Sequence, residues 1–66
     1  MEKYYIKDFY GRIKGSIETD DQGNKTARDF YGRIKGYYIK SLNVTQDFYR
    51  RIIARGDQVS SLIDLN

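Results

Sequence analysis

The sequence contains no cysteine and no histidine among its 66 residues. Without cysteine, the chain cannot be stabilised by a disulfide bond, and it lacks the commonest soft nucleophile. Without histidine, it lacks the side chain that most often exchanges protons near neutral pH. We therefore predict a protein that is not an enzyme and that uses no metal and no cofactor. The missing cysteine also fits a reducing compartment.

Leucine and alanine are scarce, with three and two copies, whereas there are eight isoleucines, seven tyrosines and three phenylalanines. β-branched and aromatic side chains suit the half-buried surface of a sheet, and leucine and alanine suit helices. The composition therefore predicts an all-β fold.

The length allows one domain, residues 1–66. A chain of this size buries only about 60% of the surface that it exposes when unfolded, so we expect it to gain stability by association with itself. Residues 1–7 lack the apolar core of a signal peptide, and no stretch is apolar enough to span a membrane. These absences predict a cytoplasmic protein with no membrane contact, and the net charge of +3 favours solubility.

An internal repeat is the strongest signal. Residues 8–15 read DFYGRIKG, residues 29–36 read the same, and residues 47–54 read DFYRRIIA. Repetition at offsets of about 20 residues indicates a duplicated unit of two strands and two turns. We predict three β-hairpin units, approximately 3–19, 24–40 and 43–57, followed by a tail, 58–66. They would form a small antiparallel sheet or a radial arrangement.

The repeated aspartate and glycine predict the turn of each hairpin. An aspartate side chain accepts a hydrogen bond from the backbone two residues on, and glycine adopts the positive φ of tight turns. The structural turn residues are Asp8, Gly11, Asp29, Gly32, Asp47 and Arg50. Arg50 replaces the glycine in the third unit, so it must either be strained or lie in a different turn.

The alternation of apolar residues predicts a loop with an even number of residues. That register places Asp8 opposite Ile13, Ile6 opposite Gly15 and Tyr4 opposite Ile17, and it separates an apolar face from a polar one. In the second unit, it places Ala27, Ile34, Gly36 and Tyr38 on the apolar face. A three-residue loop would mix the two faces.

Gly15 and Gly36 fall inside predicted strands, on the apolar face, where we expect each to admit an aromatic ring from a neighbouring unit. Tyrosine and isoleucine would then fill a common centre. In the tail, Val59, Leu62 and Ile63 fit a short helix with Asp57 as its N-cap. A strand with Val59, Ser61, Ile63 and Leu65 on one face is the alternative. Either form would cover an open edge or end of the sheet.

The pattern Tyr-Tyr-Ile-Lys-Asp, turn, Gly-Arg-Ile-Lys-Gly-x-Ile resembles that of the small bacterial four-fold β-flower domains. The resemblance covers most of residues 3–57. It implies short hairpins arranged radially, with no catalytic residues and no established function. The chain has three units rather than four, so the N-terminal strand or the tail would have to complete a ring.

The recurring Phe-Tyr pair with its nearby arginine is the candidate binding site. Exposed aromatic rings beside guanidinium groups can stack on bases or sugars. The alternative is that each phenylalanine packs under its turn and each arginine pairs with the aspartate. The candidate residues are Phe9, Tyr10, Arg12, Phe30, Tyr31, Arg33, Phe48, Tyr49 and Arg51.

The recurring aspartates, together with Asp20 and Asp21, match no calcium-loop spacing, and turn formation accounts for them. Two functions follow from these patterns. The first is a structural or interaction module, self-associating as a homo-oligomer. The second is a weak binder of nucleic acid or carbohydrate that uses the Phe-Tyr-Arg corners.

Overall fold

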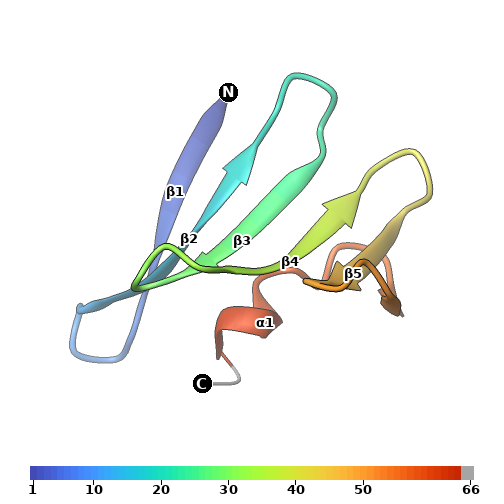
Figure 1. The fold of residues 1–66 in the computed structure, drawn as a ribbon. Helices are drawn as coiled ribbons and strands as arrows, with labels where there is room; N and C mark the ends of the chain where they lie inside the picture. The colour runs from blue at the N-terminus through green and yellow to red at the C-terminus, as the bar shows by residue number, and fades with distance from the viewer. Residues whose placement is uncertain (65–66) are drawn as a thin grey trace.

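The computed structural model describes residues 1–64 and shows one six-stranded antiparallel sheet with a short helix (Figure 1). The strands lie in chain order, and each pairs with the next. The prediction of a small all-β domain with an antiparallel sheet is therefore confirmed. The elements are β1 (Glu2–Lys7), β2 (Ile13–Thr19), β3 (Lys25–Asp29), β4 (Ile34–Ile39), β5 (Val44–Asp47), β6 (Ile52–Arg55) and α1 (Ser61–Asp64).

The order of the strands leaves the sheet open, with β1 and β6 at its two edges. Because β1, β3 and β5 run in the same direction, the turns that follow them lie at one end of the sheet. Each of these three turns contains one copy of the DFYG or DFYR motif, as expected from the repeat. We call residues 8–12, 29–33 and 47–51 the first, second and third corners. We call residues 7–14, 28–35 and 46–53 together the corner end.

The register of the first hairpin is partly as predicted. Tyr4 lies opposite Ile17 and Ile6 opposite Gly15, but Lys7, rather than Asp8, lies opposite Ile13. The prediction of an even loop was wrong, because three residues connect Asp8 to Arg12, whose backbone closes the loop. A β-bulge at Lys14, between the Ile6–Gly15 and Lys7–Ile13 pairs, then restores the even register in the rest of the strand.

The other two hairpins repeat this bulge. The pairing jumps from Arg28 opposite Ile34 to Ala27 opposite Gly36, which leaves Lys35 unpaired. In the third hairpin, the same jump leaves Ile53 unpaired. A three-residue loop is therefore compatible with separate faces, since the bulge shifts the strand by the one residue that the odd loop requires.

The core lies between the middle of the sheet and the tail. Ile17 and Ala27 of the sheet pack with Val59 and Ile63 of the tail, and all four are almost inaccessible to solvent. The prediction that tyrosine and isoleucine of the three units fill a common centre was wrong. Tyr38 is the one tyrosine among the partly buried residues around this core, together with Ile6 and Leu62.

The tail forms the predicted helix, and α1 packs against the face of β2, β3 and β4 rather than against an edge or end. The glycines on that face explain its position. A Cβ atom on Gly15 would meet the Ile63 side chain, and one on Gly36 would meet Leu62. The prediction that these glycines admit aromatic rings was wrong, since they admit aliphatic side chains of the helix.

Two contacts hold the tail in place before the helix begins. The hydroxyl of the fully buried Thr45 donates a hydrogen bond to the Gly56 carbonyl at 2.7 Å and accepts one from the Gln58 N–H at 2.9 Å. Asp57 accepts a bond from the Val59 N–H at 3.4 Å in the turn before the helix; because α1 begins at Ser61, the prediction of Asp57 as its N-cap was wrong. Its other oxygen binds Lys25 at 2.5 Å. Leu65, part of the alternative strand, lies outside the described residues.

Within residues 1–64, no helix has the length and apolar character that crossing a membrane requires.

Candidate functional site: three aromatic corners

An aspartate organises the backbone of each corner. In the first corner, Oδ1 of Asp8 accepts hydrogen bonds from the backbone N–H groups of Tyr10 at 2.8 Å and Arg12 at 2.9 Å. Its carbonyl oxygen accepts the Gly11 N–H at 3.0 Å, and its own N–H donates to the Arg12 carbonyl. Asp29 and Asp47 make the same bonds in the second and third corners.

The same aspartates hold the corner arginines. Oδ2 accepts a hydrogen bond from the arginine Nε at 2.9 Å in the first corner, 2.8 Å in the second and 3.0 Å in the third. The expected pairing of arginine with aspartate is thus present in all three corners. Each arginine side chain is also about three-quarters exposed, so the pairing fixes its position and leaves it in contact with solvent.

These hydrogen bonds lower the pKa of each aspartate from its ordinary value of 3.8. For Asp8 and Asp47, the largest cause is the bond from the backbone N–H of Arg12 and Arg51, respectively. For Asp29, burial acts in the opposite direction, and the bonds from the Arg33 backbone and side chain outweigh it. All three corners are therefore built on an ionised carboxylate at neutral pH.

The fourth residue of each corner has a positive φ. It is 81° for Gly11, 84° for Gly32 and 70° for Arg50. The third corner consequently has the same turn as the other two, and Arg50 occupies a conformation that non-glycine residues rarely adopt. Of the two alternatives from the sequence, strain in the same turn is the one observed.

The aromatic rings of the corners point into solvent. Phe9 is 95% exposed, Phe30 64% and Phe48 54%, and Tyr10, Tyr31 and Tyr49 are exposed as well. The alternative that each phenylalanine packs under its turn was therefore wrong. Because aspartate and glycine already form the turn, and the rings are more than half exposed, burial does not explain the repetition of phenylalanine and tyrosine.

Within each corner, the side chains form a small stacked group. In the first two corners, the phenylalanine and tyrosine rings meet edge to face, with centroids 5.5 and 5.4 Å apart. The guanidinium carbon lies 5.1 Å from the ring centroid of Tyr10, 5.3 Å from that of Tyr31 and 5.1 Å from that of Tyr49. Each corner thus presents an ordered aromatic pair beside a cation.

The third corner differs from the first two. The rings of Phe48 and Tyr49 are only 35° from parallel, with centroids 4.1 Å apart. The guanidinium of Arg50 lies 3.8 Å from the centroid of Tyr37, which projects from β4. This contact accounts for a residue other than glycine at that position, since a cation over an aromatic face is attractive.

Two grooves flank the second corner. The groove on the side of Lys14 has a volume of about 230 Å³, and the groove on the side of Phe48 has a volume of about 360 Å³. Lys35, Asp29 and Arg33 line both, so the second corner forms a shared wall. Lys14, Phe30 and Tyr31 complete the first groove, and Ile34 and Phe48 complete the second.

The two lysines of the grooves were missed from the sequence. Lys14 and Lys35 occupy equivalent bulge positions, two residues after the corner arginine. Their identity in both DFYGRIKG copies was a signal that sequence reasoning did not use. Ile53 takes the equivalent place in the third hairpin.

The turn between β2 and β3 has the same backbone as the corners but contains no aromatic residue. Between β2 and β3, Oδ1 of Asp20 accepts the N–H groups of Gln22 and Asn24 at 2.9 Å each. Gly23 has a φ of 88° and donates to the Asp20 carbonyl. Asp21 and Gln22 stand where the corners have phenylalanine and tyrosine. The turn therefore forms without an aromatic pair.

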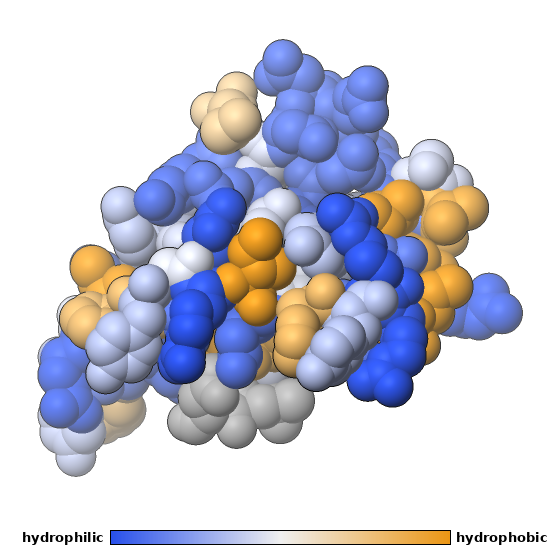
Figure 2. All heavy atoms as spheres, in the orientation of Figure 1, coloured by the Kyte–Doolittle hydropathy of each residue, from blue (hydrophilic) through white to orange (hydrophobic). Residues whose placement is uncertain are grey.

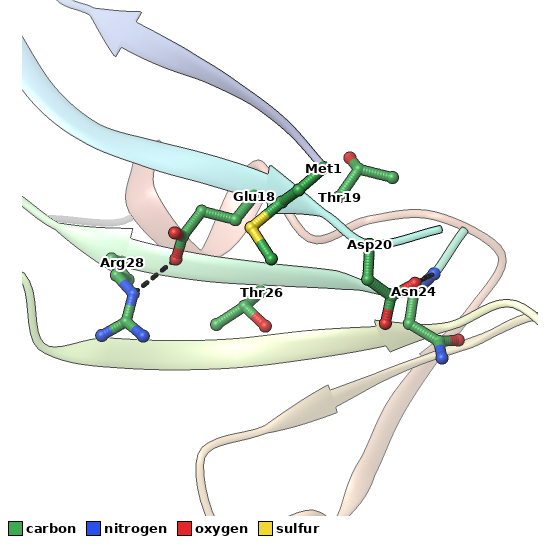
Figure 3. A pocket seen from close by; sticks show the side chains of 7 residues that line it. All are labelled: Met1, Glu18, Thr19, Asp20, Asn24, Thr26 and Arg28. Atoms are coloured by element: carbon green, nitrogen blue, oxygen red, sulfur yellow. Dashed lines mark hydrogen bonds and ion pairs between the residues drawn. The ribbon is translucent and has the colours of Figure 1, made fainter. Parts of the chain in front are cut away.

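A further hollow of about 220 Å³ lies near this β2–β3 turn (Figure 3). Its charged side chains have partners within the chain. Arg28 Nε donates to Glu18 Oε1 at 2.6 Å, and Asp20 accepts the Asn24 N–H. Unlike the corners, the hollow has no aromatic side chain in its lining. Its lining residues are Met1, Glu18, Thr19, Asp20, Asn24, Thr26 and Arg28.

Among the described residues, no group of three or more acidic side chains is arranged to hold a metal ion. The aspartates of the corners bind backbone N–H groups and arginine instead. Comparison with family models, curated proteins and solved structures gave no match. The resemblance to β-flower domains therefore stays a prediction, and any function has to be argued from the corners themselves.

Proposed function

We propose that the chain is a non-catalytic binding module whose ligand surface is the row of three corners. The observation that carries this proposal is the exposure of all three Phe-Tyr pairs, combined with the β2–β3 turn, which has the same backbone and no aromatic pair. Since folding does not require the rings, a ligand with flat faces accounts for them. Nucleobases and sugar rings both have such faces.

A titration followed by amide chemical shifts tests this proposal. The probes are a mixed-sequence single-stranded oligonucleotide and a neutral cell-wall oligosaccharide. We expect at least one probe to shift the amides of residues 8–12, 29–33 and 47–51 selectively. The proposal fails if neither probe shifts them, or if the shifts concentrate at the β2–β3 end.

The β2–β3 turn supplies matched variants. Replacing Phe9 by Asn and Tyr10 by Gln gives the first corner the polar character of Asp21 and Gln22, without a new charge. Equivalent changes in the other two corners should abolish binding while the circular dichroism spectrum stays that of the folded chain. The reverse variant, Asp21→Phe with Gln22→Tyr, adds an exposed pair outside the corner row. Tighter binding by this variant would indicate nonspecific adhesion and contradict the proposal.

Self-association is a second candidate, favoured by the exposed edge at β6. Edge strand β1 carries Glu2, Lys3 and Lys7, and such charges oppose pairing with another strand. In contrast, β6 begins with Ile52 and Ile53, which are 60% and 49% exposed. We propose that a second copy covers this edge, which would add buried area to a small core.

Sedimentation over a range of protein concentrations tests the second candidate. We expect association at high concentration and a thermal midpoint that rises with concentration. Ile52→Lys with Ile53→Lys should keep the chain monomeric, and Lys3→Gln with Lys7→Gln at the other edge should not. A wild-type chain that stays monomeric throughout would contradict this candidate.

A further inference from the structure

Charge is distributed unevenly between the two ends of the sheet. The corner end contains eight basic and three acidic residues, a net charge of +5. The rest of the chain contains four basic and six acidic residues, a net charge of −2. The overall charge of +3 therefore hides a cationic end and an anionic remainder. Such an asymmetry favours and orients an anionic partner, whereas a neutral sugar gains nothing from it.

The surface of the corner end mixes cations with aromatic rings. Figure 2 shows hydrophobic and strongly hydrophilic residues interleaved over the lower part of one face, which includes both the β1–β2 turn and α1. The upper part, around the β2–β3 turn, is mostly hydrophilic. Interleaved cations and rings are the surface chemistry of proteins that bind single strands, because the cations follow the backbone and the rings stack on the bases.

The grooves place the cations between the rings. Lys35 and Arg33 line both grooves, and Lys14 lines the first. Neighbouring corners are two strands apart, which corresponds to roughly 10 Å at the usual strand spacing. A ligand that contacts successive corners must therefore cross a groove with its connecting atoms. A chain that alternates flat rings with anionic linkers matches this order.

The corner arginines are already oriented for such a ligand. Each Nε is held by an aspartate oxygen, and the guanidinium is held beside a tyrosine ring while staying exposed. An arginine fixed in this way loses little conformational entropy when it binds a phosphate. Lys14 and Lys35 add positive charge at the groove positions.

From these observations, and building on the proposed binding module, we infer that the partner of the corner row is single-stranded nucleic acid. Its bases stack on the exposed Phe-Tyr pairs, and its phosphates lie in the two grooves against Arg33, Lys14 and Lys35. The bases are read by their flat faces alone, so binding is tolerant of sequence. A duplex binds more weakly, because its bases are stacked on one another and unavailable to the corners.

Fluorescence anisotropy with labelled 12-mers tests the inference. The probes are oligo(dT), an abasic strand with the same phosphates, a duplex, and a neutral cell-wall oligosaccharide as competitor. We expect oligo(dT) to bind at least about five-fold more tightly than the abasic strand or the duplex, since stacking contributes through each base. Each Phe→Asn/Tyr→Gln corner variant should weaken oligo(dT) binding by about five-fold or more.

Salt dependence tests the role of the grooves. Lys35→Gln should reduce the slope of log K against log salt concentration by roughly 0.7, the value for one phosphate contact in a single strand. Lys40→Gln provides the matched control, because Lys40 is exposed in the β4–β5 turn at the opposite end. That variant should leave the slope unchanged. An equal slope for both variants would overturn the placement of phosphate in the grooves.

The outcomes distinguish failure of the nucleic-acid inference from failure of the proposed binding module. If the oligosaccharide binds at the corners and oligo(dT) does not, the inference is wrong and the binding module stands. If the abasic strand binds as tightly as oligo(dT), the surface recognises polyanions without stacking, and the inference is again wrong. If no probe binds in a way that depends on the corners, both are wrong.

Discussion

Replacing the positive-φ residues of the corners separates conformational strain from side-chain contact. An ideal Cβ atom built on Gly11 or Gly32 meets no atom within 4 Å. Any cost of Gly11→Ala or Gly32→Ala is therefore conformational rather than steric. We expect each to lower the free energy of unfolding by about 1 kcal/mol, because the strain of the left-handed region exceeds what alanine gains by restricting the unfolded chain.

At Arg50, two effects oppose each other. Arg50→Gly relieves strain at a φ of 70° but makes the unfolded chain more flexible, for a net gain of about 1 kcal/mol. It also removes the guanidinium that lies 3.8 Å from the Tyr37 centroid, a contact that contributes about 0.5–1 kcal/mol at an exposed site. We therefore expect Arg50→Gly to change stability little, and Arg50→Ala to destabilise the chain by the lost contact.

Urea denaturation of these variants in the wild-type and Tyr37→Leu backgrounds measures the two effects separately. In the Tyr37→Leu background the contact is already absent, so Arg50→Gly should stabilise by about 1 kcal/mol, or roughly 4–8 °C in Tm for a domain of this size. Equal effects in both backgrounds would show that the Tyr37 contact contributes nothing. Neutral Gly11→Ala and Gly32→Ala variants would refute the positive-φ turn itself.

Three further perturbations test the core, the position of the helix on the sheet and the corner carboxylates. Ile63 is fully buried, so Ile63→Ala should lower the free energy of unfolding by about 2–5 kcal/mol, enough to unfold most molecules of so small a domain. Circular dichroism should show this loss of structure, whereas Ile52→Ala, at an exposed position, should change stability by less than about 0.5 kcal/mol. Gly15→Ala should cost more than Gly11→Ala in urea denaturation, because its Cβ would meet the Arg28 carbonyl and Ile63; equal costs would place the helix elsewhere. Because the pKa values of Asp8, Asp29 and Asp47 are lowered from 3.8, their ionised forms stabilise the fold above about pH 4, and this stability should be lost as pH falls through the lowered values. Asp47→Asn should therefore flatten the acid side of a plot of Tm against pH. An unchanged plot would contradict the ion pairing.

The hairpins and their turns could be predicted from the sequence because the signals are local. Asp8 and Gly11 specify a turn through bonds within five residues, and the alternation around Ile6 and Ile17 specifies the faces. The loop length could not be predicted by counting apolar positions. A three-residue loop with a bulge at Lys14 and an even loop with no bulge give the same pattern over most of the strand.

The core could not be assembled from the repeat, because half of it comes from outside the repeat. Val59 and Ile63 belong to the tail, and nothing local indicates that Ile63 packs on Gly15 or that Leu62 packs on Gly36. The glycines did indicate a close approach, but the identity of the approaching side chain depends on the tertiary fold. A long-range hydrogen bond, from Thr45 to Gly56, positions the segment that leads to the helix.

In each corner, the turn and the proposed binding depend on different residues of the motif. The Asp20 turn has the same hydrogen bonds as the corners, with Asp21 and Gln22 in the aromatic positions. Aspartate and the positive-φ residue are therefore sufficient for the backbone, and the Phe-Tyr pair is additional to it. Exposed aromatic rings lower solubility and add no core. Because every corner has such a pair and the Asp20 turn has polar residues instead, the exposed Phe-Tyr pairs all lie at the cationic end of the sheet, where the proposed ligand binds.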